Sequence, residues 1–198
     1  MLKIVHSIDR LNILVGKLFG WLILVMVGVI LYEVFLRYVL RTPTAWAYDM
    51  GYMLYGAIFI MAGAYALSVA AHVRGDVIYR LWSPRVQAVL DLLLYLLFFF
   101  PAIVALIYAG YFFAEFSWRI GERSSSGPGG PPVYHFKTLI PLAAAFLFVQ
   151  GLAEVLRCVM CIRDNNWPAR LRDVQEVDVE AAKRILGGAD IDNKGVTR

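Results

Sequence analysis

Four long runs of apolar side chains alternate with short polar segments along this chain. The runs extend from Leu18 to Leu36, Met50 to Ala71, Leu92 to Ala114 and Leu139 to Ile162. A helix needs about 20 apolar residues to cross the hydrocarbon core of a bilayer, and lipid offers no hydrogen-bond partner to an open backbone. The pattern therefore predicts an all-α integral membrane protein with four transmembrane helices.

The polar segments between these runs set the expected domain limits. The expected spans are residues 18–38, 49–71, 86–116 and 138–162. Together they form a transmembrane domain over residues 18–162, followed by a polar cytoplasmic tail over residues 163–198. Ser83 and Pro84 favour a start of the third helix in the membrane interface. Pro101 falls inside that helix and should kink it.

The first 17 residues have a helical pattern of their own. Apolar residues recur at helical spacing at Ile4, Val5, Ile8, Leu11 and Val15. Charged and amide side chains lie between them. This arrangement predicts an amphipathic helix over residues 1–17 that lies in the cytoplasmic interface and leads into the first span. A cleaved signal peptide is the competing interpretation, but the apolar run is too long and no small-residue cleavage site precedes Glu33. We expect the segment to be retained.

Composition and charge support a membrane protein. Hydrophobic residues make up 60% of the chain and charged residues 17%, whereas soluble domains are about a quarter charged. With the N-terminus inside, ten Lys and Arg residues lie on the cytoplasmic side and five on the other, which places both termini in the cytoplasm. The net charge of +4 reflects this bias, and no nucleic-acid partner is expected, since no basic stripe is interleaved with aromatics.

Charged residues near the span ends occur in opposite-charge pairs at helical spacing. The pairs are Glu33 with Arg37, Glu115 with Arg119, and Glu154 with Arg157. Residues three or four apart share a helix face, so each pair can form an intrahelical ion pair. An ion pathway would instead place an unpaired carboxylate at mid-membrane. Ion pairing and anchoring at the span ends are therefore favoured over a direct role in conduction.

Enzyme and cofactor chemistry find little support in the sequence. His6, His72 and His135 each fall at or outside a span boundary, and His72 and His135 are expected on opposite sides, which argues against joint haem ligation. Cys158 and Cys161 form a Cys-x-x-Cys step within the fourth helix, where helix packing explains them better than a zinc site. No phosphate loop or nucleophile with its base is visible. We expect no enzyme activity, metal or cofactor.

Three polar motifs now distinguish among membrane protein classes. They are His72-Val73-Arg74-Gly75-Asp76-Val77 after the second span, Glu33-x-x-x-Arg37-Tyr38 closing the first, and Trp46-Ala47-Tyr48-Asp49 opening the second. With the Ser117-Trp118 pair, Pro141 and the four-span layout, they make about residues 10–163 resemble the small permease subunit of TRAP transporters, the DctQ-like proteins. The chain departs from the family pattern at Asp49, where glutamate is more frequent, and at Gly75, where an apolar residue such as valine is common.

This resemblance implies one component of a tripartite uptake system in the inner or plasma membrane of bacteria or archaea. A periplasmic binding protein delivers an organic acid or related solute to a membrane pair, whose large permease subunit performs sodium-coupled symport. The small subunit braces the large one as a static scaffold. Candidate contacts with the large permease subunit or the binding protein are Glu33, Arg37, Trp46, Tyr48, Asp49, His72, Arg74 and Asp76.

The resemblance also suggests local roles for the two groups of candidate residues. Asp49 would cap the second helix, and Trp46 would anchor the outer surface at the lipid headgroups. Arg74 and Asp76 would pair with each other or with the partner subunit. Ordinary interfacial anchoring is the alternative for both groups.

Two other function classes share the four-helix layout. A haem- or quinone-binding membrane anchor of a respiratory enzyme would show a haem absorption band that depends on His72 or His135. A tetraspan assembly protein would bind a partner without any linked sodium-driven uptake. Identification of the proteins that co-purify with the chain separates these classes from the transporter subunit.

Overall fold

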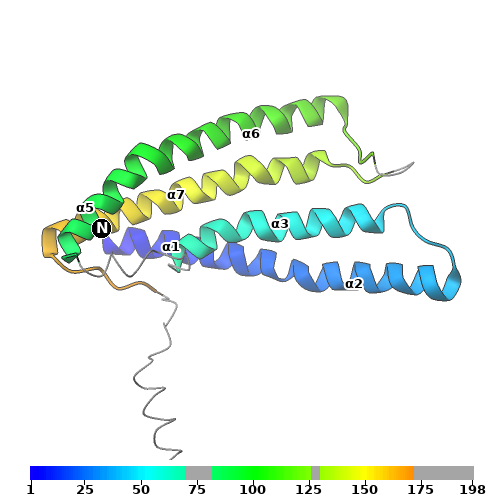
Figure 1. Ribbon diagram of the computed structural model, residues 1–198, viewed down its shortest axis with the longest axis horizontal. Coiled ribbons are helices and arrows are strands. Elements are labelled where there is room, and N and C mark those ends of the chain that lie inside the picture. The colour runs from blue at the N-terminus through cyan, green and yellow to red at the C-terminus, as the bar shows by residue number, and fades with distance from the viewer. Residues whose placement is uncertain (70–81, 126–129, 172–198) are drawn as a thin grey trace, which may run out of the picture.

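A computed structural model describes residues 1–69, 82–125 and 130–171, and within them the regular elements are all helices (Figure 1). The elements are α1 (Leu2–Gly20), α2 (Leu22–Phe35), the π-helical turn η1 (Leu36–Leu40), α3 (Ala47–Ser68), α5 (Pro84–Leu94), the π-helical turn η2 (Tyr95–Phe99), α6 (Phe100–Ile120) and α7 (Tyr134–Asp164). The all-α fold predicted from the sequence is confirmed. The cytoplasmic-turn candidates His72, Arg74 and Asp76 lie outside the described residues.

Four continuous helical stretches are long and apolar enough to cross a membrane. They are Leu2–Leu40, Ala47–Ser68, Pro84–Ile120 and Tyr134–Asp164, with 39, 22, 37 and 31 residues. At 1.5 Å per residue, the first is about 58 Å long and α3 about 33 Å. Since the hydrocarbon core is about 30 Å thick, α3 matches its thickness and the other three stretches exceed it. Four membrane-crossing helices are therefore present, as predicted.

These helices lie side by side in a single layer (Figure 1). Helix α6 packs along α7, α7 along α3, and α3 along both α1 and α2, while α1 also packs against α7. The edge helices α2 and α6 do not pack extensively against each other. The chain therefore forms an open layer with two broad exposed sides, not a closed four-helix bundle.

Close approach between neighbouring helices depends on small residues. A Cβ atom added at Gly16 of α1 would lie 2.5 Å from Cβ of Tyr65 on α3. One added at Gly110 of α6 would lie 3.3 Å from the backbone nitrogen of Pro141 on α7. Small side chains let helix backbones approach closely where no hydrophobic driving force exists in lipid. The layer is thus held by tight local contacts and buries few large apolar side chains.

The third span begins at Pro84 and bends near Pro101, as these two prolines predict. Helix α5 starts at Pro84 with Ser83 as its N-cap residue, but the Ser83 side chain makes no capping hydrogen bond. The π-helical turn η2 directly precedes α6, and Pro101 occupies the first turn of α6. Proline has no N–H and crowds the preceding turn, and a wider π turn relieves this conflict. The span curves in this region (Figure 1).

The N-terminal segment is helical, but it is buried on an unexpected face. Helix α1 continues into α2 through Trp21, whose backbone is helical (φ −65°, ψ −21°). Its buried residues are Val5, Asp9 and Asn12, so two polar side chains face the protein. The physical reason is that α7 offers them charged and amide partners. The location of α1 in the membrane interface stays a prediction.

Candidate functional site

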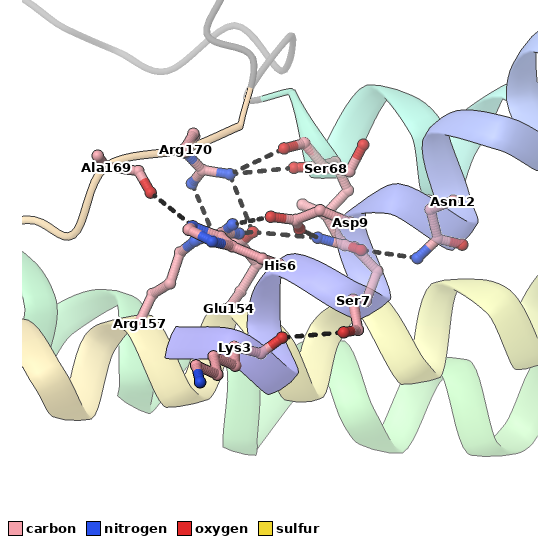
Figure 2. Close-up of polar contacts among 12 residues, drawn as sticks. Lys3, His6, Ser7, Asp9, Asn12, Ser68, Glu154, Arg157, Ala169 and Arg170 are labelled. Carbon is pink, nitrogen blue, oxygen red and sulfur yellow. Dashed lines mark hydrogen bonds and ion pairs between the residues drawn. The ribbon is translucent and has the colours of Figure 1, made fainter. Parts of the chain in front are cut away.

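A cluster of buried polar side chains joins α1, α7 and the segment that follows α7. Its members are Asp9, Asn12, Gln150, Glu154, Arg157 and Arg170. Figure 2 shows the two arginines converging on Glu154, with Asp9 approaching from α1. In Figure 1, the cluster lies at the end of the layer where N marks the N-terminus. It is the largest concentration of charge inside the described part of the protein.

Arg157 is the centre of this cluster. Its guanidinium donates through Nη2 to Asp9 and through Nη1 to Glu154. All three side chains are at most 2% exposed. Breaking a buried pair of this kind by removing one partner costs several kcal/mol, because the remaining charge is stranded. Arg157 thus ties α1 to α7.

Arg170 supplies the second positive charge. Its Nη1 lies 2.9 Å from Oε1 of Glu154 and its Nη2 lies 2.7 Å from Oε2, a bidentate arrangement that is stronger and more directional than a single bond. Nη1 also lies 3.4 Å from the backbone oxygens of both Leu67 and Ser68. These carbonyls end α3, where a cation interacts favourably with the helix dipole. The two arginines therefore balance the two buried carboxylates.

Two amides extend the cluster toward the membrane-spanning region. Asn12 Nδ2 donates to Gln150 Oε1 over 2.6 Å, and Gln150 Nε2 donates to Asp9 Oδ1 over 3.0 Å. Both amides are at most 1% exposed. Within the described residues, Asn12 Oδ1 and Arg157 Nε have no hydrogen-bond partner. The amides connect the ion pairs to the apolar part of the α1–α7 contact.

Residues 165–171, which we name the strap, follow α7 and turn back toward α1, α3 and α5. Asn165 adopts a left-handed conformation with φ 52°, which favours helix termination. Trp167 Nε1 then donates to Gln87 of α5 over 3.2 Å, and the backbone oxygen of Ala169 lies 3.2 Å from His6 Nε2 of α1. With Arg170, the strap contacts α1, α3, α5 and α7.

The end of the layer opposite the buried cluster holds a second polar group. Arg37 Nη2 lies 2.7 Å from Oε1 of Glu33. Oε2 of Glu33 accepts hydrogen bonds from the backbone N–H (3.1 Å) and the hydroxyl (2.5 Å) of Thr44. Glu33 therefore connects the end of the first span to the turn that leads into α3.

Trp46 packs in this turn, but the expectation that Asp49 caps the second span is wrong. The Trp46 ring stacks on Tyr32, with ring centroids 6.2 Å apart. Trp46 is the N-cap residue of α3, and Asp49 makes no capping hydrogen bond. Asp49 is 7% exposed and its Oδ2 has no hydrogen-bond partner among the described residues. Its place in the first turn still suits the positive end of the helix dipole.

Two further ion pairs lie on α6 and between the loop after α6 and the start of α7. Arg119 Nη2 lies 2.5 Å from Glu115 Oε1, with the Arg119 side chain 72% exposed. Glu122, in the loop after α6, accepts a 2.5 Å hydrogen bond from Lys137. This contact holds the pKa of Glu122 below the ordinary glutamate value of 4.5. The Lys137 ammonium also lies 4.0 Å from the ring centroid of Phe113, a favourable cation–π distance.

Within the described residues, the histidines and cysteines make packing and hydrogen-bond contacts. His6 lies at the strap, while the ring of His135, at the start of α7, meets that of Trp118 edge to face. Cys158 and Cys161 form no disulfide and are buried against Ala88 of α5. Among residues 1–69, 82–125 and 130–171, no group of three or more His, Cys, Asp or Glu side chains could hold a metal ion.

Part of the buried cluster can be predicted from the sequence. The spacing of Glu154 and Arg157 predicts their contact, but the helical pattern of residues 1–17 predicts that its charged and amide side chains, which include Asp9 and Asn12, lie on the polar side of an interfacial helix. Arg170 falls in the predicted polar tail. One signal was available: Asp9 and Asn12 are three residues apart and share a helix face with Val5, which suggests a polar seam.

Comparison with known families now decides the class of this protein. Residues 26–160 match the family described as the DctQ component of tripartite ATP-independent periplasmic transporters. The chain belongs to the DctQ family. The resemblance seen in its motifs is confirmed, and this DctQ protein is a multi-pass membrane protein and a small membrane subunit of a TRAP transporter. No curated protein matches the chain.

The DctQ assignment bears on the function classes left open above. The DctQ family is a transporter component and not an enzyme, so a respiratory membrane anchor is not favoured. DctQ proteins work with a large permease and a solute-binding protein in TRAP systems. The matched range includes Glu154 and Arg157 but ends before Arg170 and begins after Asp9. Half of the buried cluster thus lies outside the matched range.

Proposed function

We propose that this DctQ protein is the static scaffold for the large permease subunit of a sodium-coupled TRAP transporter that takes up an organic acid or related solute. The observation that carries the proposal is the open single layer. Helix α2 buries none of its residues, and most of its side chains are exposed apolar groups. A layer with two uncovered sides suits a subunit that lies against a larger membrane protein.

The paired charges support a static role. Glu33 and Glu154 are each held by an arginine within this chain. A carboxylate engaged in this way ties helices together and is not offered to a moving ion. Under this proposal, sodium coupling and solute selection belong to the large permease subunit and the binding protein.

The exposed side chains on one side of α3 favour contact with a protein rather than with lipid. Tyr48, Tyr52, Tyr55 and Phe59 follow one another at helical spacing, and they are 73%, 69%, 58% and 71% exposed. None of the three hydroxyls has a hydrogen-bond partner among the described residues. Leaving a hydroxyl without a partner in hydrocarbon costs roughly 2–7 kcal/mol, and tyrosine is enriched at protein interfaces. We name these four residues the aromatic stripe and propose that the large subunit packs on it.

The outer turn would extend this contact. Tyr48 is the outermost member of the aromatic stripe, and Trp46 and Asp49 lie beside it in the chain. Glu33 and Arg37 brace the same turn. We propose that this outer group meets the large permease subunit or the periplasmic binding protein. The inner candidates His72, Arg74 and Asp76 keep their proposed role at the cytoplasmic turn, with both termini in the cytoplasm.

Co-purification tests the scaffold proposal. The tagged chain should recover a much larger multi-span protein at equal stoichiometry, and uptake in liposomes supplied with the solute-binding protein should require both membrane proteins. Tyr52→Leu/Tyr55→Leu should lower recovery of the large protein, because the hydroxyls and rings are lost from the contact. The matched variant Tyr52→Phe/Tyr55→Phe keeps the rings and isolates the hydroxyls. Uptake by this chain alone, or recovery without a large membrane protein, would refute the proposal.

A further inference from the structure

A groove of about 440 Å³ lies on the third span, where α5 passes into the π-helical turn η2. Its lining residues are Asp91, Leu94, Tyr95, Phe98 and Phe99. These positions recur at a spacing of three and four residues, so they share one face of the helix. One lining side chain is a carboxylate and the others are apolar or aromatic. Such a groove fits an elongated apolar ligand with a positive group at one end.

Contacts with α7 hold the inner wall of this groove in place. The ring of Phe99 lies so close to Gly151 of α7 that a Cβ atom added there would overlap it. The Tyr95 ring meets that of Phe99 edge to face, with ring centroids 5.2 Å apart. On the open side, Leu94 and Phe98 are 56% and 67% exposed. The groove is therefore formed before any ligand arrives.

The depth of Asp91 in the bilayer follows from the length of the third span. Trp118, near the far end of α6, is 51% exposed, and tryptophan is enriched at the headgroup level of a bilayer. Asp91 precedes Trp118 by 27 residues, or about 40 Å of helix. A bilayer with its headgroups is about 40–45 Å thick. Asp91 therefore lies at the headgroup level of the opposite leaflet. Ala88, one turn before Asp91, packs on Cys158, next to Arg157 of the buried cluster, which identifies this leaflet as the one nearest the N-terminus.

The rest of the groove extends from this level toward the acyl chains. Phe98 and Phe99 follow Asp91 by seven and eight residues, which is about 11 and 12 Å of helix. Half of the hydrocarbon core is about 15 Å thick, so the whole groove lies within one leaflet. Its carboxylate is at the headgroups and its aromatic rings are among the acyl chains, as the two ends of one lipid molecule would require.

We propose that this groove binds one phospholipid whose headgroup ends in an ammonium, with the ammonium at Asp91 and an acyl chain along Leu94 and Phe98. Charge complementarity favours this occupant, because the charged residue of the lining is a carboxylate. A carboxylate has about four lone-pair sites, so Asp91 can accept a hydrogen bond from the ammonium in addition to a contact within the chain. The ring of Tyr95, one turn further along, adds a cation–π attraction for the same group.

Native mass spectrometry tests this proposal. The full-length chain, with any protein that accompanies it, is freed of lipid in mild detergent and titrated with phosphatidylethanolamine or phosphatidylglycerol of identical acyl chains. Phosphatidylethanolamine should bind more tightly, because phosphatidylglycerol has no ammonium. Asp91→Asn should weaken the binding of phosphatidylethanolamine about ten-fold or more and remove the preference. The matched variant Asp164→Asn, which removes a carboxylate that is 58% exposed at the same end of the layer, should retain it.

Two further measurements separate a lipid from other sources of an ammonium. Soluble phosphoethanolamine at the same concentration should not displace the lipid, because it has no acyl chain to fill the groove. Phe98→Ala, which removes one wall, should weaken both lipids alike, and this variant decides the role of the groove even if Asp91→Asn fails to fold.

Three results would overturn the proposal. The first is equal binding of the two lipids by the wild type, and the second is displacement of phosphatidylethanolamine by soluble phosphoethanolamine. The third is an Asp91→Asn variant that keeps the lipid preference but loses a co-purifying protein, because the carboxylate would then bind that protein.

Discussion

Replacement of Arg157 by methionine tests the energetic role of the buried cluster. The substitution removes both ion pairs made by a side chain that is 1% exposed and leaves Asp9 without a cation. Removing one partner of a buried ion pair costs about 3–5 kcal/mol. For a chain of this size, 1 kcal/mol shifts the thermal midpoint by about 2–4 °C, so a fall of about 6–20 °C is expected. Loss of monodisperse protein on heating in mild detergent measures this midpoint.

Two further variants make this prediction specific. Arg119→Met removes a cation whose side chain is 72% exposed, and an exposed pair is worth at most about 1 kcal/mol. Asp9→Asn/Arg157→Met removes one charge of each sign, so it should be more stable than Arg157→Met alone. The reasoning is refuted if Arg157→Met melts within about 2 °C of the wild type, or if Arg119→Met is equally damaging.

Three other substitutions probe separate parts of the layer. Gly16→Ala should lower the thermal midpoint because its new Cβ meets a tyrosine of α3 at 2.5 Å, while Gly20→Ala, with open space around it, should keep or raise it. The hydrogen bond from a lysine lowers the pKa of Glu122 below 4.5, so its stabilisation is present above pH 4.5 and lost as the pH falls through the lowered value. The midpoint should therefore fall more between about pH 5 and pH 3 in the wild type than in Glu122→Gln. Glu33→Ala should raise the reactivity of a cysteine placed at Thr42 toward a polar thiol reagent, and unchanged reactivity would count against a bracing role.

The spans could be predicted because each depends on its own residues. An apolar run of sufficient length becomes a helix in lipid whatever its neighbours are, and the spacing of Glu33 with Arg37 is local in the same sense. Pro84 and Pro101 likewise act on adjacent turns. These features are visible in one segment of sequence at a time.

The buried cluster and the layer depend on contacts between distant segments. Asp9 and Asn12 resemble the solvent-facing side of an amphipathic helix until α7 supplies Gln150 and Arg157 as partners. Arg170 lies in a polar segment whose return toward α3 depends on the turn at Asn165. Helical periodicity also predicts the same four spans for a closed bundle and an open layer, so the arrangement could not be predicted.

The pairing of Asp9 with α7 has a consequence for the biosynthesis of the protein. The partners of Asp9 within the described residues are Gln150 and Arg157, which follow it by 141 and 148 residues. At about 5–20 residues per second, the ribosome needs about 7–30 s to reach Arg157 after Asp9 is made. The first span is therefore made before Asp9, which lies ahead of it in α1, has its cation, and a chain that stops before α7 keeps this charge unpaired. Completion of the last span is thus the step that locks the first one in place, and it distinguishes a finished subunit from a truncated one.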